Sequence, residues 1–151
     1  MVETLERIIH QHPFFQDMEE GHIELITGCA KNVHFERGQV ILREGEEANE
    51  LYLIREGLVA VELATPTKGV FRVQTVGEGD VLGWSWLVPP YRWRFSARAC
   101  QSTRALALDA KCLRTKCEED HHLGYQFVKR FTSVVTERLD ATRLQLMDLI
   151  S

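Results

Sequence analysis

The stretch that decides the fold runs from Val76 to Ala99 and reads VGEGDVLGWSWLVPPYRWRFSARA. A glycine-punctuated turn leads to a tight step at Gly83, and a short helical turn, two prolines and several arginines follow. A glycine lets backbone N–H groups approach an anion closely, and the first turn of a helix points free N–H groups outward. Because the arginine fork matches phosphate oxygens, this combination is typical of a phosphate cradle.

Short apolar runs cut by glycines extend along the chain around this stretch. Their spacing of roughly 8 to 12 residues, with glycines at the turns, indicates an antiparallel β-sandwich or barrel. The runs span residues 33–35, 40–42, 51–54, 59–63, 70–76, 81–82, 95–100 and 105–108.

Helical patterns flank the predicted strands. The first thirty residues hold two short apolar stripes at helical spacing, which His12-Pro13 separates. Asp109 is expected to cap a short helix, and a long helix follows and ends near Leu149. Because no linker rich in serine, glycine or proline divides the chain, we predict a single domain. Its parts are N-terminal helices (1–30), a β-barrel (31–108) and C-terminal helices (109–151).

The composition excludes several classes of protein. Hydrophobic residues make up 44% and charged residues 26% of the 151 residues, which is ordinary for a globular domain. No apolar run approaches the ~18 residues of a membrane span, and the N-terminus lacks the pattern of a secretory signal. The net charge of −4 argues against a general nucleic-acid binder. Residues 81–108, with four arginines and no acid, either receive an anion or carry solvated side chains.

Patterns for catalysis and metal binding are weak. The sequence has no GxSxG, P-loop or HExxH motif. A metal-dependent barrel enzyme needs histidines that converge inside the barrel, yet only His34 of six histidines lies among the predicted strands. His121-His122 is expected to be a solvated helix start. We therefore expect no catalytic residue, no metal and no cofactor.

The cysteines match no zinc or iron–sulfur spacing. Since no export signal is visible, we expect four free thiols in a reducing cytoplasm, with Cys100 in the core. A redox pair formed by Cys112 and Cys117 is the alternative. The four are Cys29, Cys100, Cys112 and Cys117.

Several short motifs follow one another in order over nearly the whole chain. They are Phe35-x-x-Gly38-x-Val40-Ile41-x-x-Glu44-Gly45, Leu51-Tyr52-Leu53-Ile54-x-x-Gly57-x-Val59-x-Val61, Val76-x-x-Gly79-Asp80-x-Leu82-Gly83, Ser96-Ala97-Arg98-Ala99 and Arg138-Leu139. This series resembles the cyclic-nucleotide-binding domain of the catabolite activator and fumarate–nitrate regulator family, of cyclic-nucleotide-dependent kinases and of gated channels. The resemblance implies a mainly β fold, a double-stranded β-helix (a jelly-roll-like β-roll) with N-terminal helices and a long C-terminal helix.

The resemblance also marks a candidate ligand site. In family members that bind cyclic nucleotides, a glutamate after the glycine holds the ribose hydroxyl, and a later arginine pairs with the cyclic phosphate. Here Gly83 is kept, but Trp84 stands at the glutamate position and Trp93 at the arginine position. We therefore expect a ligand other than an ordinary cyclic nucleotide bound in the usual way. The candidate ligand-binding residues are Gly83, Trp84, Ser85, Arg92, Trp93, Arg94, Ser96 and Thr142.

Three tryptophans, Trp84, Trp86 and Trp93, fall within ten residues. They either fill space or line or plug a pocket that suits an aromatic or apolar ligand better than a ribose phosphate. Arg92 and Arg94 flank Trp93, so a loop redrawn at Pro89-Pro90 would bring one of them to an anion.

The long helix carries an apolar stripe with 4-3 spacing, which is typical of a helical dimer seam. We predict a homodimer through parallel long helices. Phe127, Phe131 and Val134 lie on an adjacent face and are expected to pack on the barrel. Alternatively, the whole apolar surface covers the chain's own barrel. The predicted seam comprises Val128, Val135, Leu139, Thr142, Leu146 and Leu149, with Thr132 completing the series.

Together these patterns predict a stand-alone, non-enzymatic sensor domain that binds a small ligand and signals through its C-terminal helix. Because the chain ends two residues beyond Leu149, we expect no helix-turn-helix and no direct DNA binding. We also expect a partner protein, and we expect no association with a membrane. Two alternatives remain open: an interaction module with an inert pocket, and a true cyclic AMP or cyclic GMP receptor with a rearranged cassette.

Overall fold

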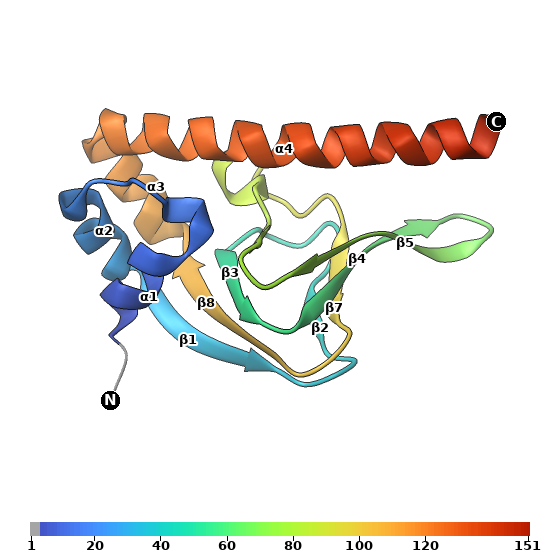
Figure 1. Ribbon diagram of the computed structural model, residues 1–151, viewed down its shortest axis with the longest axis horizontal. Coiled ribbons are helices and arrows are strands. Elements are labelled where there is room, and N and C mark those ends of the chain that lie inside the picture. The colour runs from blue at the N-terminus through green and yellow to red at the C-terminus, as the bar shows by residue number, and fades with distance from the viewer. Residues whose placement is uncertain (1–3) are drawn as a thin grey trace.

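The computed structural model describes residues 4–151 as a β-roll with helices at one end and a long helix along one side (Figure 1). Two short helices and a 3-10 turn come first, and two helices end the chain. Their bounds are α1 (Leu5–Gln11), η1 (Pro13–Phe15), α2 (Glu20–Thr27), α3 (Ala110–Glu119) and α4 (His121–Ile150), and the short turn η2 (Ser85–Leu87) lies between strands.

Within residues 4–151, eight antiparallel strands form two four-stranded sheets. One sheet has the order β1-β8-β3-β6 and the other β2-β7-β4-β5. This arrangement confirms the predicted mainly β fold class, a β-roll with flanking helices. The strands are β1 (Ala30–Phe35), β2 (Val40–Leu42), β3 (Glu50–Glu56), β4 (Leu58–Thr65), β5 (Gly69–Gly77), β6 (Val81–Leu82), β7 (Ser96–Ala99) and β8 (Thr103–Asp109).

Aromatic rings join the first half of α4 to the roll. The fully buried Trp86 ring lies 5.4 Å from Phe127 and 5.9 Å from Phe131, between ring centroids. Phe127 and Phe131 are four residues apart and therefore share one face of α4. The prediction that Phe127, Phe131 and Val134 pack on the barrel is confirmed. Burial of each large aromatic ring contributes roughly 2–3 kcal/mol, which holds α4 on the roll.

Aspartate caps set where the last two helices begin. Oδ1 of Asp109 accepts the backbone N–H of Cys112 at the start of α3. Oδ1 of Asp120 accepts the N–H groups of His122 and Leu123 at the start of α4. Each cap satisfies amides that have no carbonyl partner in the first helical turn. Figure 1 shows that α4 continues past the roll and ends beyond its body, on the side where the β4–β5 hairpin projects.

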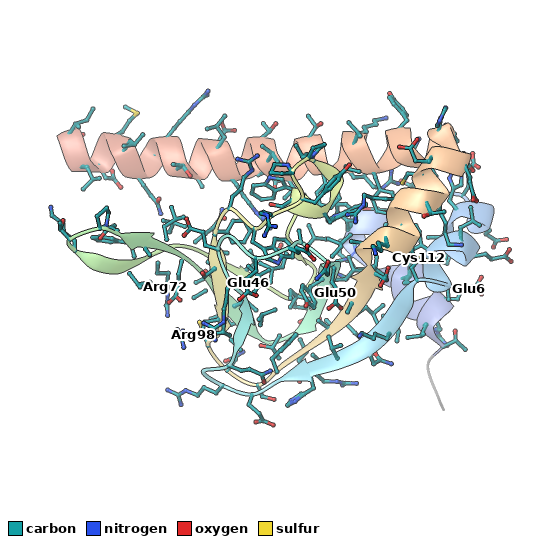
Figure 2. The ribbon with its side chains drawn as sticks, turned by 180° about the vertical axis from the view of Figure 1, so that it is seen from behind. Glu6, Glu46, Glu50, Arg72, Arg98 and Cys112 are labelled. Atoms are coloured by element: carbon teal, nitrogen blue, oxygen red, sulfur yellow. A yellow bond between two sulfur atoms is a disulfide. The ribbon has the colours of Figure 1, made fainter. Side chains whose placement is uncertain are left out.

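A disulfide joins Cys29, just after α2, to Cys112 on α3. Figure 2 shows Cys112 on α3, at the end of the molecule where the N-terminal helices lie. The prediction of four free thiols is therefore wrong, as is the alternative of a Cys112–Cys117 pair, because only Cys100 and Cys117 are free. Because the expectation of a reducing compartment rested on four free thiols, the disulfide removes the reason for it. Among the described residues, no helix is long and apolar enough to cross a membrane.

The buried His12 is held as a neutral imidazole. Its Nδ1 accepts the backbone N–H of Phe14 at 3.2 Å, so Nε2 carries the proton and donates to the carbonyl of Ile54, also at 3.2 Å. Burial lowers the pKa of His12, against the opposing influence of the Ile54 carbonyl and of Asp80.

We expect stability to fall in acid because of this histidine. The unfolded chain binds a proton at His12 below pH ~6.5, whereas the folded chain resists it. The free energy that neutral His12 contributes is thus complete above that pH and is lost as the pH falls toward the lowered folded value. When urea unfolding is measured between pH 7.5 and pH 5, the free energy of unfolding should change less with pH for His12→Asn than for the wild type. The exposed His10, changed to Asn as a control, should leave the slope unaltered; equal slopes in all three proteins would contradict the assignment.

Candidate functional site

Trp93, which stands at the sequence position where the family resemblance implies a phosphate-binding arginine, occupies the space above Gly83. Gly83 has a φ of 95°, in the left-handed region that favours glycine. A Cβ built on Gly83 would lie 2.4 Å from Cζ3 of the Trp93 indole. Trp93 is 6% exposed, so its ring packs directly on the glycine backbone.

Backbone pairing fixes Trp93 in this position. The Trp93 N–H donates to the carbonyl of Glu46, and its carbonyl accepts the N–H of Gly45, at 2.9 and 2.8 Å. The N–H of Ala48 donates to the carbonyl of Tyr91 at 2.7 Å. These three hydrogen bonds join residues 91–93 to the turn after β2. They therefore fix the course of the loop that follows Pro89-Pro90.

Three further candidate side chains are buried or bonded to the chain's own backbone. Ser85 is buried in η2, and its hydroxyl has no hydrogen-bond partner among residues 4–151. The hydroxyl of Ser96 accepts the N–H of Glu44 at 3.0 Å. The guanidinium of Arg92 donates to the carbonyl of Gly45 at 3.0 Å. Ser96 and Arg92 thus bond to backbone groups of the chain at positions where sequence analysis expected ligand contacts, whereas the Ser85 hydroxyl makes no such bond.

The remaining candidates line a groove of about 280 Å³ between the roll and α4. Trp84 and Arg94 approach it from the roll, and Thr142 lies on its α4 side. Of the eight candidates, these three share one concave surface, whereas Gly83, Ser85, Arg92, Trp93 and Ser96 lie outside it. The groove is lined by Val61, Leu63, Val73, Gln74, Trp84, Arg94, Phe95, Val135, Arg138, Leu139 and Thr142.

Two arginines give this largely apolar groove a positive charge. The guanidinium of Arg138 lies 5.3 Å from the centre of the Trp84 ring and donates a hydrogen bond to the carbonyl of Val81. Burial lowers the pKa of Arg138, with Asp80 and Glu137 opposing the change, and an arginine remains charged at neutral pH. Arg94 is exposed and has no hydrogen-bond or ion-pair partner among residues 4–151. The groove can therefore hold an anionic group beside an apolar body.

Sequence reasoning missed Arg138 as a member of the site. The signal was present, because Arg138 continues the barrel-facing series that begins with Phe127, Phe131 and Val134. An arginine on the buried face of a helix is uncommon unless it has a partner or a role.

Comparison with known protein families assigns the fold to a named group. The family model described as "Cyclic nucleotide-binding domain" matches residues 32–120, which is more than half of the chain. The chain belongs to the cyclic nucleotide-binding domain family. Modules of this family are typically regulatory and non-catalytic.

Relatives of this cyclic nucleotide-binding domain are longer proteins. The chain is 27% identical over 146 residues to the CRP-like cAMP-activated global transcriptional regulator of Mycobacterium tuberculosis, an alignment that covers 97% of this chain and 63% of the regulator. It is 33% identical over 102 residues to a putative potassium channel protein of Rhodopseudomonas palustris, covering 68% of this chain and 24% of the channel. The chain thus spans less than two thirds of the length of these curated relatives.

A solved structure of similar size shares the architecture. The putative cyclic nucleotide-binding protein of Geobacter metallireducens superimposes with a TM-score of 0.78 at 25% identity, over 92% of this chain and 99% of the other.

Proposed function

We propose that this cyclic nucleotide-binding domain is a non-catalytic sensor of a small anionic ligand with an apolar body. The single observation that carries the proposal is the groove under α4, where Trp84, Arg94 and Arg138 surround an otherwise largely apolar surface. An apolar pocket with a few convergent polar groups is the usual form of a small-molecule site.

Ordinary cyclic nucleotides are expected to fit poorly at Gly83, the position that the family resemblance marks for their binding. The Trp93 indole fills the space above Gly83, and Trp84 offers no carboxylate to a ribose hydroxyl. Each lost charge-assisted hydrogen bond costs on the order of 2–3 kcal/mol, or about a hundredfold in affinity. We therefore propose that cyclic AMP and cyclic GMP bind weakly or undetectably.

The groove also suggests how ligand binding reaches the rest of the molecule. Leu139 and Thr142 line the groove and also belong to the 4-3 stripe of α4. A ligand that contacts these two residues therefore touches the proposed dimer seam. If the ligand binds more tightly to one position of α4, it shifts α4 toward that position and alters the packing of the seam. We propose that α4 carries the signal to a second copy or to a partner protein. Within these 151 residues we propose no direct contact with DNA.

Binding of an aromatic sulfonate tests the groove. Anilinonaphthalene sulfonate combines a negative charge with an apolar ring system, and its fluorescence rises when the rings leave water. We expect the native protein to bind the dye, and Arg94→Ala to weaken binding about tenfold or more because the anion loses its exposed guanidinium. Arg92→Ala is the matched control, since Arg92 donates to Gly45 outside the groove.

Calorimetry with cyclic AMP and cyclic GMP separates the alternatives. Micromolar binding of either nucleotide that is lost in Arg94→Ala would establish a true cyclic-nucleotide receptor with a rearranged cassette and overturn the proposed ligand class. An absence of binding to the dye and to both nucleotides would instead favour an interaction module with an inert pocket, for which the packing of Trp93 on Gly83 is the supporting observation.

A further inference from the structure

Side chains from two helices that are far apart in the sequence meet at one end of the molecule. Glu19 immediately precedes α2, His22 is the third residue of α2, and His122 is the second residue of α4. Figure 1 shows α2 and the start of α4 at the same end of the structure. One oxygen of Glu19 lies 3.6 Å from Nε2 of His122, and the other lies 4.0 Å from Nδ1 of His22. A donor atom from each residue lies within 4.8 Å of the other two.

His22 is the buried member of this cluster, and one of its nitrogens lacks a partner. The residue is 6% exposed, and its Nε2 lies 3.2 Å from Oδ2 of Asp120. Since a carboxylate only accepts hydrogen bonds, the neutral imidazole that could bind a metal has its proton on Nε2 and its lone pair on Nδ1. Nδ1 has no hydrogen-bond partner among residues 4–151. An unsatisfied buried nitrogen that faces the carboxylate of Glu19 is costly.

A cation between these groups removes that cost. It accepts the lone pair of His22 Nδ1, neutralises the Glu19 carboxylate and takes His122 as a third ligand. Two imidazoles and one carboxylate are a ligand set that zinc uses when a water fills the fourth position. The carboxylate of Asp120 on the far nitrogen of His22 completes the carboxylate–histidine–metal arrangement that orients metal-bound histidines.

We propose that Glu19, His22 and His122 form a site for a divalent transition metal, with zinc as the ion best matched to the ligands, and that Asp120 positions His22. The site fastens the start of α2 to the start of α4. The Cys29–Cys112 disulfide ties the region after α2 to α3, so the two links hold the N-terminal helices to both C-terminal helices. Sequence analysis expected no metal, because only His34 lies among the predicted strands and the cysteines match no metal spacing. His22 and His122 are a hundred positions apart, so no local spacing joins them.

Zinc titration of the full chain tests this site. The protein is treated with chelator, kept with its disulfide intact, and titrated with zinc chloride by calorimetry at pH 7.5. We expect one zinc ion per chain and a rise in the unfolding temperature on binding. His22→Gln and His122→Gln should each weaken zinc binding by about a hundredfold or more. Asp120→Asn keeps a good helix cap and should weaken binding roughly 10- to 100-fold.

The neighbouring His121 supplies the matched control. It is exposed, belongs to the same helix start and lies outside the cluster, so His121→Gln should bind zinc like the wild type. Because His122 is exposed, His122→Gln tests the site even where the buried His22 variant folds poorly. Absence of zinc binding in the wild type would overturn the proposal. Binding that survives both histidine changes, or that is lost equally in His121→Gln, would overturn it as well, because other groups would then hold the ion.

Discussion

Replacing Cys29 by serine is expected to lower the free energy of unfolding by about 4 kcal/mol. The disulfide joins residues 83 positions apart, and cross-linking a loop of that length removes a large share of the unfolded chain's conformational entropy. Cys112→Ser should cost the same amount. The double variant should cost no more than either single change, since both remove one bond. Urea unfolding of the oxidised proteins, monitored by tryptophan fluorescence, measures the differences.

The two free cysteines provide matched controls for this effect. Cys100→Ser and Cys117→Ser leave the bond intact and should change stability far less. A reductant should bring the wild type to the stability of Cys29→Ser and leave that variant unaffected. Thiol titration of the denatured protein should count two thiols before reduction and four after it. Burial raises the pKa of the Cys117 thiol to about 11, so this thiol should react slowly in the native state. Four thiols in unreduced protein would show that the bond does not form.

The β-roll was predictable because its signals are local. Glycine-bounded apolar runs mark strands through side-chain alternation and turn chemistry alone, and each run corresponds to one of β1 to β8. The two C-terminal helices were predictable for the same reason, because Asp109 is a local cap and α4 has no proline. These features depend on residues that are close together in the sequence, so they can be predicted without knowing the long-range contacts.

The site was only partly predictable because its geometry depends on long-range packing. The sequence showed that Trp93 replaces an arginine, but only the backbone pairing with Gly45 and Glu46 shows the indole lying on Gly83. Arg138 contacts Trp84 although the two residues are more than fifty positions apart in the sequence. The disulfide was missed for a related reason, since cysteine spacing does not determine connectivity.

Introducing two charges into the α4 stripe is expected to convert a dimer into a monomer. Val128, Val135, Leu139, Leu146 and Leu149 are 38 to 81% exposed. Together with Thr132 and Thr142 they form a continuous 4-3 series that a second helix would cover. Leu139→Glu together with Leu146→Glu places four carboxylates in a two-fold seam, where desolvation and mutual repulsion oppose association. Light scattering should then give the 17.4 kDa mass of one chain, whereas the wild type should give twice that mass.

Leu144 and Met147 test whether the stripe, rather than general apolar exposure, causes association. They are 65% and 59% exposed but fall outside the 4-3 series. The double change Leu144→Glu and Met147→Glu adds the same charge to the C-terminal half of α4 but outside the seam, so the protein should remain dimeric. Circular dichroism should show α4 intact in both double variants, which separates dissociation from unfolding. A wild type that is monomeric at high micromolar concentration would contradict the dimer, and α4 would then present its stripe to a different partner protein.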